Sequence, residues 1–391
     1  MRLSLLACDA FARACRCDGM TSLPNFSRKV KRDSLGVVNH SDQGEMECKL
    51  ATDVIPFAGV NLRIVRRDIS GDDAGDTDAS PTSNADGDDD DDWVDPNFFD
   101  DGYTVAATTG FCRVWEGAEV LTRLLEDDSG DISLRRRVAG KRVLELGAGV
   151  GLCGIAAASV GAHVMCTDLE AVVEGVIYRN IGENTDTFSE TGTLTTPSLS
   201  SSPPWRMSEH IAGGNGGTCV AQVLDWTQSI DASIEAQRRL GQRRRVLSRE
   251  DTTGATSWPC IGKDDDDDDD AQCVNDPRDC ELVMAAECLW LRELVDPFCE
   301  TVTDLMRAAR ERRGIELPCV LSFRDRSSKD TDKDADDEGG ESPLGAFVPV
   351  SDVVAAFEAK GCGWRTLHAS PSTEDAGYHV HVFEITPPPV A

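Results

Sequence analysis

The segment that most constrains the fold is residues 141–168, KRVLELGAGVGLCGIAAASVGAHVMCTD. A short apolar run leads into a cluster of glycines, small and apolar residues follow, and a second apolar run ends at Asp168. Short apolar runs bounded by glycine are typical of buried strands. The sequence therefore predicts a unit made of a strand, a tight turn, a helix and a second strand.

The spacing inside this unit predicts a ligand site. Gly147, Gly149 and Gly151 follow the first strand, where glycine lets the backbone turn tightly and approach a ligand closely. The next helix directs free N–H groups at that ligand, which suits a carboxylate or a phosphate. Asp168, about 20 residues further on, is placed to accept hydrogen bonds from ribose hydroxyls. We therefore expect a nucleoside with an anionic tail.

Two cofactor classes fit these residues. Gly149, Gly151 and Gly154 satisfy the dinucleotide pattern GxGxxG, which favours NAD. The longer string LELGAGVG, with Glu145 two residues before the first glycine, favours S-adenosyl-L-methionine. A glycine-rich turn without a ligand is the third interpretation. The eight-residue string with its correctly spaced acid is the more specific signal, so we expect the sulfonium cofactor.

The charge of the chain is strongly negative and unevenly spread. The net charge is −31, and much of it lies in acidic runs at residues 88–92, 264–270 and 330–341. Such runs repel themselves and stay solvated, which predicts flexible acidic loops. The alternative is an electrostatic dock for a basic protein partner. In either case the field opposes binding to a nucleic-acid backbone, so we expect no nucleic-acid partner.

The cysteines predict neither a metal site nor disulfides. None of the 15 forms a CxxC pair, and Cys166, Cys219, Cys288 and Cys319 fall inside apolar runs, where free cysteine acts as a small hydrophobic residue.

There is no secretory signal and no long apolar span, which predicts a cytoplasmic protein with reduced thiols and no membrane contact. The basic first 32 residues loosely resemble an organelle transit peptide, with a disordered extension as the alternative.

The chain is predicted to contain one large domain. Residues 1–50 show no sustained period and are expected to form a disordered extension, and residues 51–391 form the domain. Two short apolar runs in residues 51–70 predict an N-terminal hairpin. Low-complexity insertions are expected near residues 71–102, 185–217, 228–279 and 327–346. The sequence leaves the oligomeric state open, and we expect a monomer.

The remaining periodic segments predict an α/β fold. Buried apolar runs at residues 219–224, 282–286 and 319–323 alternate with amphipathic helices, and two strands close the chain at residues 364–367 and 378–385. The helix that follows residues 282–286 is expected to start at an Asp296 cap with Pro297 in its first turn. We therefore expect a Rossmann-like, seven-stranded, mostly parallel sheet with helices on both faces and one antiparallel edge strand. Ligands of such sheets bind at the carboxyl ends of the strands, where the glycine turn, Asp168, Trp226 and Glu287 should converge.

Several strings together resemble one family. VWEGAEVL, VLELGAGVGLCGI, TDLEAVVEGVIYRNIGEN, VLDW and AAECLWL are similar to those of the family-16 seven-β-strand methyltransferases, which are methyltransferase-like protein-lysine enzymes. The resemblance covers about residues 109–184, 218–227 and 281–386. The glycine string is shared by all methyltransferases of this fold, whereas the tryptophan-bearing helix and the Leu-Asp-Trp strand end are narrower signals.

The resemblance implies a role for individual residues. Trp115 would wall the cofactor site, although a core position is the plain alternative. The glycine loop would cradle the methionine part, and Asp168 would hold the ribose hydroxyls. Trp226 would lie by the adenine. The implied cofactor-binding residues are Trp115, Gly147, Ala148, Gly149, Asp168, Trp226 and Ala286.

Glu287 and Trp290 are the implied catalytic residues, and they depart from the family pattern. The family has D-x-x-Y at the substrate entrance, where this chain has E-C-L-W. The acid is retained with one more methylene, and the aromatic ring is retained without its hydroxyl. Trp290 keeps the ability to wall an aliphatic chain or face a cation. Glu287 as a simple helix cap is the competing interpretation.

The sequence thus predicts an S-adenosylmethionine-dependent protein-lysine N-methyltransferase that acts on a protein with an accessible lysine. Two alternatives share the fold: methylation of a small-molecule amine, and a cofactor-binding interaction module without turnover. A dehydrogenase is a further alternative, but no His or Lys is placed for hydride chemistry.

Overall fold

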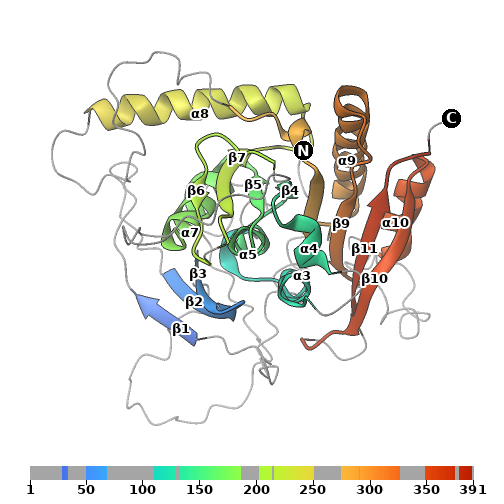
Figure 1. The fold of residues 1–391 in the computed structure, drawn as a ribbon, viewed down its shortest axis with the longest axis horizontal. Helices are drawn as coiled ribbons and strands as arrows, with labels where there is room; N and C mark the ends of the chain where they lie inside the picture. Colours follow the sequence, from blue (N-terminus) through green and yellow to red (C-terminus); the bar gives the residue numbers. More distant parts are fainter. Residues whose placement is uncertain are drawn as a thin grey trace, which may run out of the picture.

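The computed structural model describes residues 29–33, 50–67, 110–128, 133–185, 202–213, 215–250, 274–289, 291–325, 348–374 and 378–389. An eight-stranded mixed sheet with helices on both faces dominates this part of the chain (Figure 1). Its strands are β4 (Arg142–Leu146), β5 (His163–Asp168), β6 (Glu209–His210), β7 (Thr218–Val223), β8 (Leu282–Ala286), β9 (Cys319–Arg324), β10 (Gly363–Pro371) and β11 (His379–Thr386). The expected α/β class is confirmed.

The strand order places the predicted ligand unit at the centre of the sheet. The order is β10-β11-β9-β8-β4-β5-β7-β6, and the five strands from β9 to β7 run parallel. The order reverses at β4, since the chain runs outward to β5 on one side and later returns to β8 on the other. Ligands of open sheets bind at such a reversal, outside the carboxyl ends of the strands.

The sheet has two apolar faces because successive side chains of its strands point in opposite directions. In β4, Val143 packs with one core cluster, and Leu144 and Leu146 pack with the other. The first face is covered by α3 (Glu116–Glu126), α4 (Leu134–Val138), α5 (Leu152–Ser159), α6 (Glu170–Val172), the π-helical turn η2 (Val173–Ile177) and α7 (Tyr178–Glu183). The second is covered by α9 (Arg292–Arg313) and α10 (Val350–Ala359). The cysteines predicted as small core residues, Cys166, Cys219, Cys288 and Cys319, are all buried.

The closing strands differ from the expected arrangement in one respect. β11 is antiparallel to both of its neighbours, but it lies between β9 and β10 rather than at the edge. The hairpin β10–β11 inserts its second strand next to β9, so the first strand, β10, becomes the edge. An eighth strand, the two-residue β6, pairs antiparallel with β7 at the opposite edge. Two residues carry too little periodicity to be predicted.

The predicted N-terminal hairpin is present as β2 (Leu50–Phe57) and β3 (Val60–Arg67), which turn at Ala58 and Gly59. β1 (Lys29–Asp33), in the extension expected to be disordered, pairs with β2. Asn180 holds the hairpin to the domain: its amide accepts from Val65 N at 2.8 Å and donates to Val65 O at 2.9 Å. The side chain thereby continues the hydrogen bonding of an edge strand.

Two helices differ from the sequence expectation. Helix α9 begins at Arg292, so Pro297 lies inside it rather than in its first turn after an Asp296 cap. At this sixth helical position proline removes the hydrogen bond that its N–H would donate to the carbonyl of Glu293, so the first turn is joined to the rest of α9 without that bond. The segment 228–279, expected as a low-complexity insertion, begins with α8 (Ile230–Glu250), a 21-residue helix.

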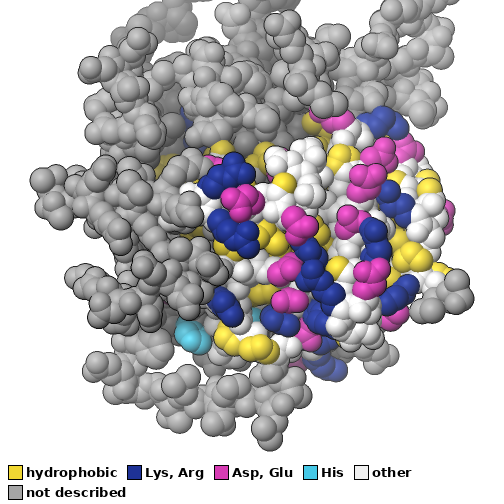
Figure 2. Space-filling view, turned by 90° about the horizontal axis from the view of Figure 1, so that it is seen from above, with side chains coloured by type: hydrophobic (Ala, Val, Ile, Leu, Met, Phe, Trp, Pro, Cys, Tyr) yellow, Lys and Arg dark blue, Asp and Glu magenta, His cyan; other side chains and the backbone are white. Residues whose placement is uncertain are grey.

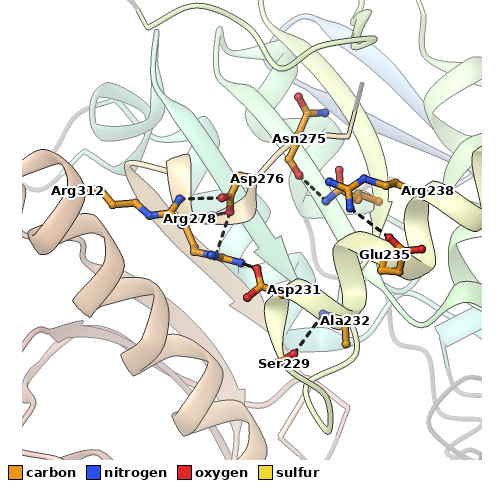
Figure 3. Close-up of polar contacts among 10 residues, drawn as sticks. Ser229, Asp231, Ala232, Glu235, Arg238, Asn275, Asp276, Arg278 and Arg312 are labelled. Carbon is orange, nitrogen blue, oxygen red and sulfur yellow. Dashed lines mark hydrogen bonds and ion pairs between the residues drawn. The ribbon is translucent and has the colours of Figure 1, made fainter. Parts of the chain in front are cut away.

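Helix α8 is joined to the body through the turn η4 (Pro277–Asp279) and the end of α9. Figure 3 shows Arg278 between Asp231 of α8 and Asp276, while Arg312 of α9 reaches Asp276 at 2.7 Å. Figure 2 shows that basic and acidic side chains are interleaved on the face seen from above. No single-sign patch of described side chains therefore covers this face.

Part of the expected insertions packs against the sheet. Within residues 185–217, Trp205 is buried and donates its indole N–H to His163 O at 2.9 Å. The acidic runs at residues 88–92, 264–270 and 330–341, like the insertions 71–102 and 327–346, lie outside the described residues. No helix in the described ranges is long and apolar enough to cross a membrane.

Candidate active site

The glycine loop between β4 and α5 lies across the carboxyl ends of the central strands. Gly147, Gly149 and Gly151 have φ of 64°, 53° and 81°, in the left-handed region that only glycine adopts at little cost. Between them, Ala148 N donates to Thr167 O of β5 at 3.0 Å. The loop is thereby tied to the neighbouring strand at the carboxyl edge of the sheet.

Asp168 faces the glycine loop from the end of β5, as the sequence predicted. Its two carboxylate oxygens accept from Gly149 N and Leu169 N, both at 2.8 Å. Burial raises the pKa of Asp168 to about 6, and the two backbone hydrogen bonds oppose that rise. The carboxylate oxygens retain lone pairs for hydroxyl donors, so the group is suited to a ribose.

A second acid, Glu145, lies beneath the loop. It is buried, and Cys166 Sγ donates to its Oε2 at 3.3 Å. Burial raises the pKa of Glu145 to about 8, with Asp168 adding to the rise. A Cβ on Gly154 would lie 2.4 Å from Glu145 Oε2, so only glycine allows α5 to pack this closely. The acid is a structural support under the loop rather than a ligand contact.

Trp226 lies against the loop, at the position that the Leu-Asp-Trp strand end predicted. A Cβ on Gly147 would meet Trp226 Cζ2 at 2.9 Å, and the indole packs edge-on against Phe298 with ring centroids 5.2 Å apart. Its buried Nε1 finds no hydrogen-bond acceptor among the described residues. Asp225 instead closes its own turn, accepting from Thr227 N at 2.8 Å.

Trp115 directly precedes α3 and is half-buried. The guanidinium carbon of Arg113 lies 4.4 Å from the centre of its ring, which is a cation–π contact. Ala148 lies inside the glycine turn, and Ala286 is the last residue of β8. The predicted cofactor residues therefore come from five segments at one edge of the sheet: the start of α3, the glycine loop and the ends of β5, β7 and β8.

Glu287 differs from the expected rim acid. It is 5% exposed, has φ of +54° in a region unusual for a side chain of its size, and accepts from Gly117 N at 3.1 Å. Its own N–H donates to Ser322 O of β9 at 2.9 Å. It caps α3, which is distant in sequence, and not the helix that follows it. Trp290 lies outside the described residues.

Sequence reasoning missed two glycines that shape this edge. A Cβ on Gly117 would lie 2.5 Å from Glu287 Cγ, so the close approach of the acid to α3 requires glycine. A Cβ on Gly110 would lie 3.5 Å from Gly149 Cα, which places residues 110–112 over the glycine loop. The signal for both was the string TGFCRVWEG, which carries Gly110 and Gly117 on either side of Trp115.

Comparison with known proteins identifies this part of the chain. Residues 105–196 match the family model described as lysine methyltransferase, and this segment carries Trp115, the glycine loop and Asp168. The segment is similar to this family of lysine methyltransferases. The resemblance seen in the sequence is thereby confirmed for these residues.

Three curated relatives share the segment. Protein N-lysine methyltransferase METTL21A of Danio rerio is 48% identical over 71 residues, which are 18% of this chain and 29% of that protein. Protein-lysine methyltransferase METTL21E of Bos taurus is 42% identical over 74 residues, 19% of this chain and 24% of that protein. EEF1A lysine methyltransferase 3 of Mus musculus is 35% identical over 103 residues, which are 26% of this chain and 38% of that protein. Each alignment spans well under half of the relative.

Among solved structures, magnesium protoporphyrin IX methyltransferase from Synechocystis aligns over 74% of this chain and 91% of its own, with a TM-score of 0.35 and 13% identity. The strand order itself is the evidence for the fold.

The residues at this edge fit S-adenosyl-L-methionine. The glycines of the loop have positive φ, Asp168 offers carboxylate oxygens, and the buried indole N–H of Trp226 has no acceptor among the described residues. An adenosyl group offers hydroxyl donors, which match Asp168, and ring nitrogen acceptors, which match the indole N–H of Trp226.

Proposed function

We propose that the chain is an S-adenosyl-L-methionine-dependent protein-lysine N-methyltransferase. The observation that carries the proposal is the lysine methyltransferase match over residues 105–196, whose Trp115, glycine loop and Asp168 meet at one edge of the sheet. The printed names of the relatives add support, since all three are described as lysine or protein-lysine methyltransferases. The partner is accordingly a protein with an accessible lysine.

The reaction needs little covalent chemistry from the protein, because the sulfonium supplies an already activated methyl group. The chain must hold a lysine amine in line with the S–CH3 bond, and that amine must first lose a proton and its hydration. The glycine loop, Asp168 and Trp226 hold the cofactor in the proposal. Trp115, at the start of α3, walls the same site.

Glu287 is proposed to orient the lysine ammonium through a charge-assisted hydrogen bond. Its position directly after β8, against Gly117 in the first turn of α3, supports this assignment. The competing role is the cap on Gly117 N alone. Glu287→Gln separates the two, because the glutamine amide oxygen still accepts from Gly117 N while the negative charge is lost.

Incubation with labelled S-adenosylmethionine and cell lysate tests the proposal. The wild type is expected to label protein, and Glu287→Gln is expected to lower kcat while cofactor affinity and Tm stay unchanged. Absence of any labelled protein with the wild type contradicts the proposed function. Unchanged kcat in Glu287→Gln leaves the methyltransferase intact and reduces Glu287 to a cap.

Two controls separate the alternatives that share this fold. Label that appears only in the acid-soluble fraction indicates a small-molecule amine as acceptor. A thermal shift with NAD and none with S-adenosylmethionine indicates a dehydrogenase. We expect the opposite result in both experiments.

A further inference from the structure

A buried ionic network fastens the turn between β10 and β11 to the start of α3. Glu116, the first residue of α3, is 2% exposed and accepts from Ser372 Oγ at 2.6 Å. The backbone N–H and hydroxyl of Thr373 donate to its other oxygen at 2.6 and 2.9 Å. Burial alone would raise the pKa of Glu116, but these hydrogen bonds together lower it. The group is therefore a carboxylate at neutral pH.

Two arginines extend the network toward the cofactor edge. Arg324, the last residue of β9, lies 3.6 Å from Glu116 Oε2 and 2.7 Å from Glu374 Oε2, and only 3% of its side chain is exposed. Arg113 donates to the other oxygen of Glu374 at 2.6 Å, and its guanidinium covers the ring of Trp115. Charges of alternating sign thus link the hairpin turn to the tryptophan that walls the cofactor site.

The network is better suited to fixing a geometry than to stabilising the fold. A buried ion pair loses much of its attraction to desolvation, and an apolar pair of similar volume often stabilises as well. What the pairing fixes here is the place of residues 372–374, because each of them is bonded to Glu116 or Arg324 or, for Glu374, to both arginines. Two segments distant in sequence, residues 113–116 and the end of β9, supply the partners.

The turn is fixed beside the residues assigned to the acceptor. Glu116 and Gly117 are neighbours in α3, and Gly117 N is the donor held by Glu287. Ser322 Oγ of β9 donates to Gly117 O at 2.8 Å, two residues before Arg324. The start of α3 is thus shared between the proposed catalytic acid and the hairpin turn, while Thr373 remains exposed on the outer side.

We propose that residues 372–374 form one wall of the entrance for the acceptor protein, with Arg113 and Arg324 as the positioning residues that hold it. The inference rests on the proposed function, since it names the surface that the methylated protein contacts. Acceptor selection then lies in the C-terminal hairpin, outside the segment that matches the family model.

Two variants and a matched control test the wall. Glu374→Gln and Arg113→Gln remove the pairing, and Arg113→Lys retains the positive charge. Arg365→Gln is the control: it removes an ion pair between an exposed arginine and the buried Glu384, which keeps Arg137 as a partner, at the opposite end of the same hairpin. The readouts are hydrogen exchange of residues 372–378, the Kd for S-adenosylmethionine, and the rate of label transfer as a function of lysate protein concentration.

We expect both Gln variants to speed exchange of the turn at least tenfold and to raise the apparent KM for lysate protein at least tenfold, with kcat and cofactor Kd within twofold of wild type. Arg113→Lys should restore KM, and Arg365→Gln should match wild type. If the wild type is active but the Gln variants keep its KM, or lose activity through kcat or cofactor affinity, the proposed acceptor wall is wrong and the proposed function stands. If the wild type labels no protein, both the proposed function and the acceptor wall are wrong.

Discussion

At the scale of single residues, the charge of Asp168 is expected to control cofactor affinity. Its pKa is raised to about 6 by burial, and only the ionised form offers every oxygen lone pair to ribose hydroxyls. We predict that affinity for S-adenosylmethionine weakens by roughly tenfold as pH falls from 7.5 to 5. Calorimetric titration of wild type and Asp168→Asn checks this. A variant with the same pH dependence as wild type would show that another group is responsible.

Gly149 is expected to be indispensable because of its backbone rather than its surroundings. A Cβ there would approach nothing closer than Gly110 O at 3.5 Å, yet φ is +53°. We predict that Gly149→Val lowers stability by roughly 1–2 kcal/mol, the cost of a left-handed side-chain residue, and abolishes cofactor binding. Gly182→Val is the matched control, since a Cβ on Gly182 meets no atom within 4 Å. Thermal unfolding with and without cofactor separates the two effects, and a Gly149→Val protein that still binds would disprove the loop assignment.

Residues whose role depends on nearby sequence were the ones that the sequence located correctly. Gly147, Gly149 and Asp168 belong to one 28-residue unit, and Trp226 follows shortly after the end of β7 at Val223. Glu287 was located, but its partner Gly117 lies 170 positions away, so no local pattern indicated that the acid would cap α3. The same holds for Glu116 and Thr373, which are 257 positions apart.

At the scale of elements, the spacing of apolar residues predicted the central strands and most helices, because burial of one face of an element imposes that spacing. The prediction failed where something other than burial of one face sets the position or attachment of a helix. Pro297 suggested a helix start, but the buried stripe of α9 already includes Val295, and the helix begins before the proline, at Arg292. Helix α8 is rich in charge and is attached through an ion pair between Asp231 and Arg278 of η4, so its sequence resembles a solvated insertion.

The attachment of the N-terminal hairpin gives a prediction at this scale. Asn180 and Asn184 each bridge the backbone of β3, but only Asn180 also donates to Val150 O in the glycine loop, at 2.7 Å. We expect either alanine variant to lower the free energy of unfolding by roughly 1–3 kcal/mol through unsatisfied backbone groups. Only Asn180→Ala should also weaken cofactor binding. Denaturant titration measures the free energy of unfolding, and calorimetry measures cofactor affinity. If the two variants bind the cofactor equally well, the hydrogen bond from Asn180 to Val150 O does not support the glycine loop.

At the scale of the whole molecule, parallel crossovers and the reversal at β4 followed from the order of buried runs. The position of β11 inside the sheet did not, because both orders of a hairpin satisfy the same alternation of apolar residues. The edge is therefore set by tertiary contacts: Val380 and Val382 of β11 join the core, whereas β10 stays largely exposed.

The buried acids make the stability of the whole fold depend on pH in an unusual direction. Burial raises the pKa of Glu145 from 4.5 to about 8, so between these values the folded protein binds a proton that the unfolded chain does not. Its contribution to the free energy of unfolding is fully present below pH 4.5 and is lost as pH rises through about 8. Asp168 adds a contribution of the same sign that is lost as pH rises through about 6.

We therefore predict that Tm falls between pH 5 and pH 8.5, in contrast to a protein whose acids are mainly ion-paired. Glu145→Gln keeps an acceptor for Cys166 Sγ and carries no charge, so its Tm should exceed that of wild type at pH 8.5 and vary less with pH. Glu293→Gln, on the exposed start of α9, should follow the wild-type curve. Scanning calorimetry across this range measures the three curves. A Glu145→Gln curve parallel to wild type would mean that the acid beneath the glycine loop is already ionised in the folded protein.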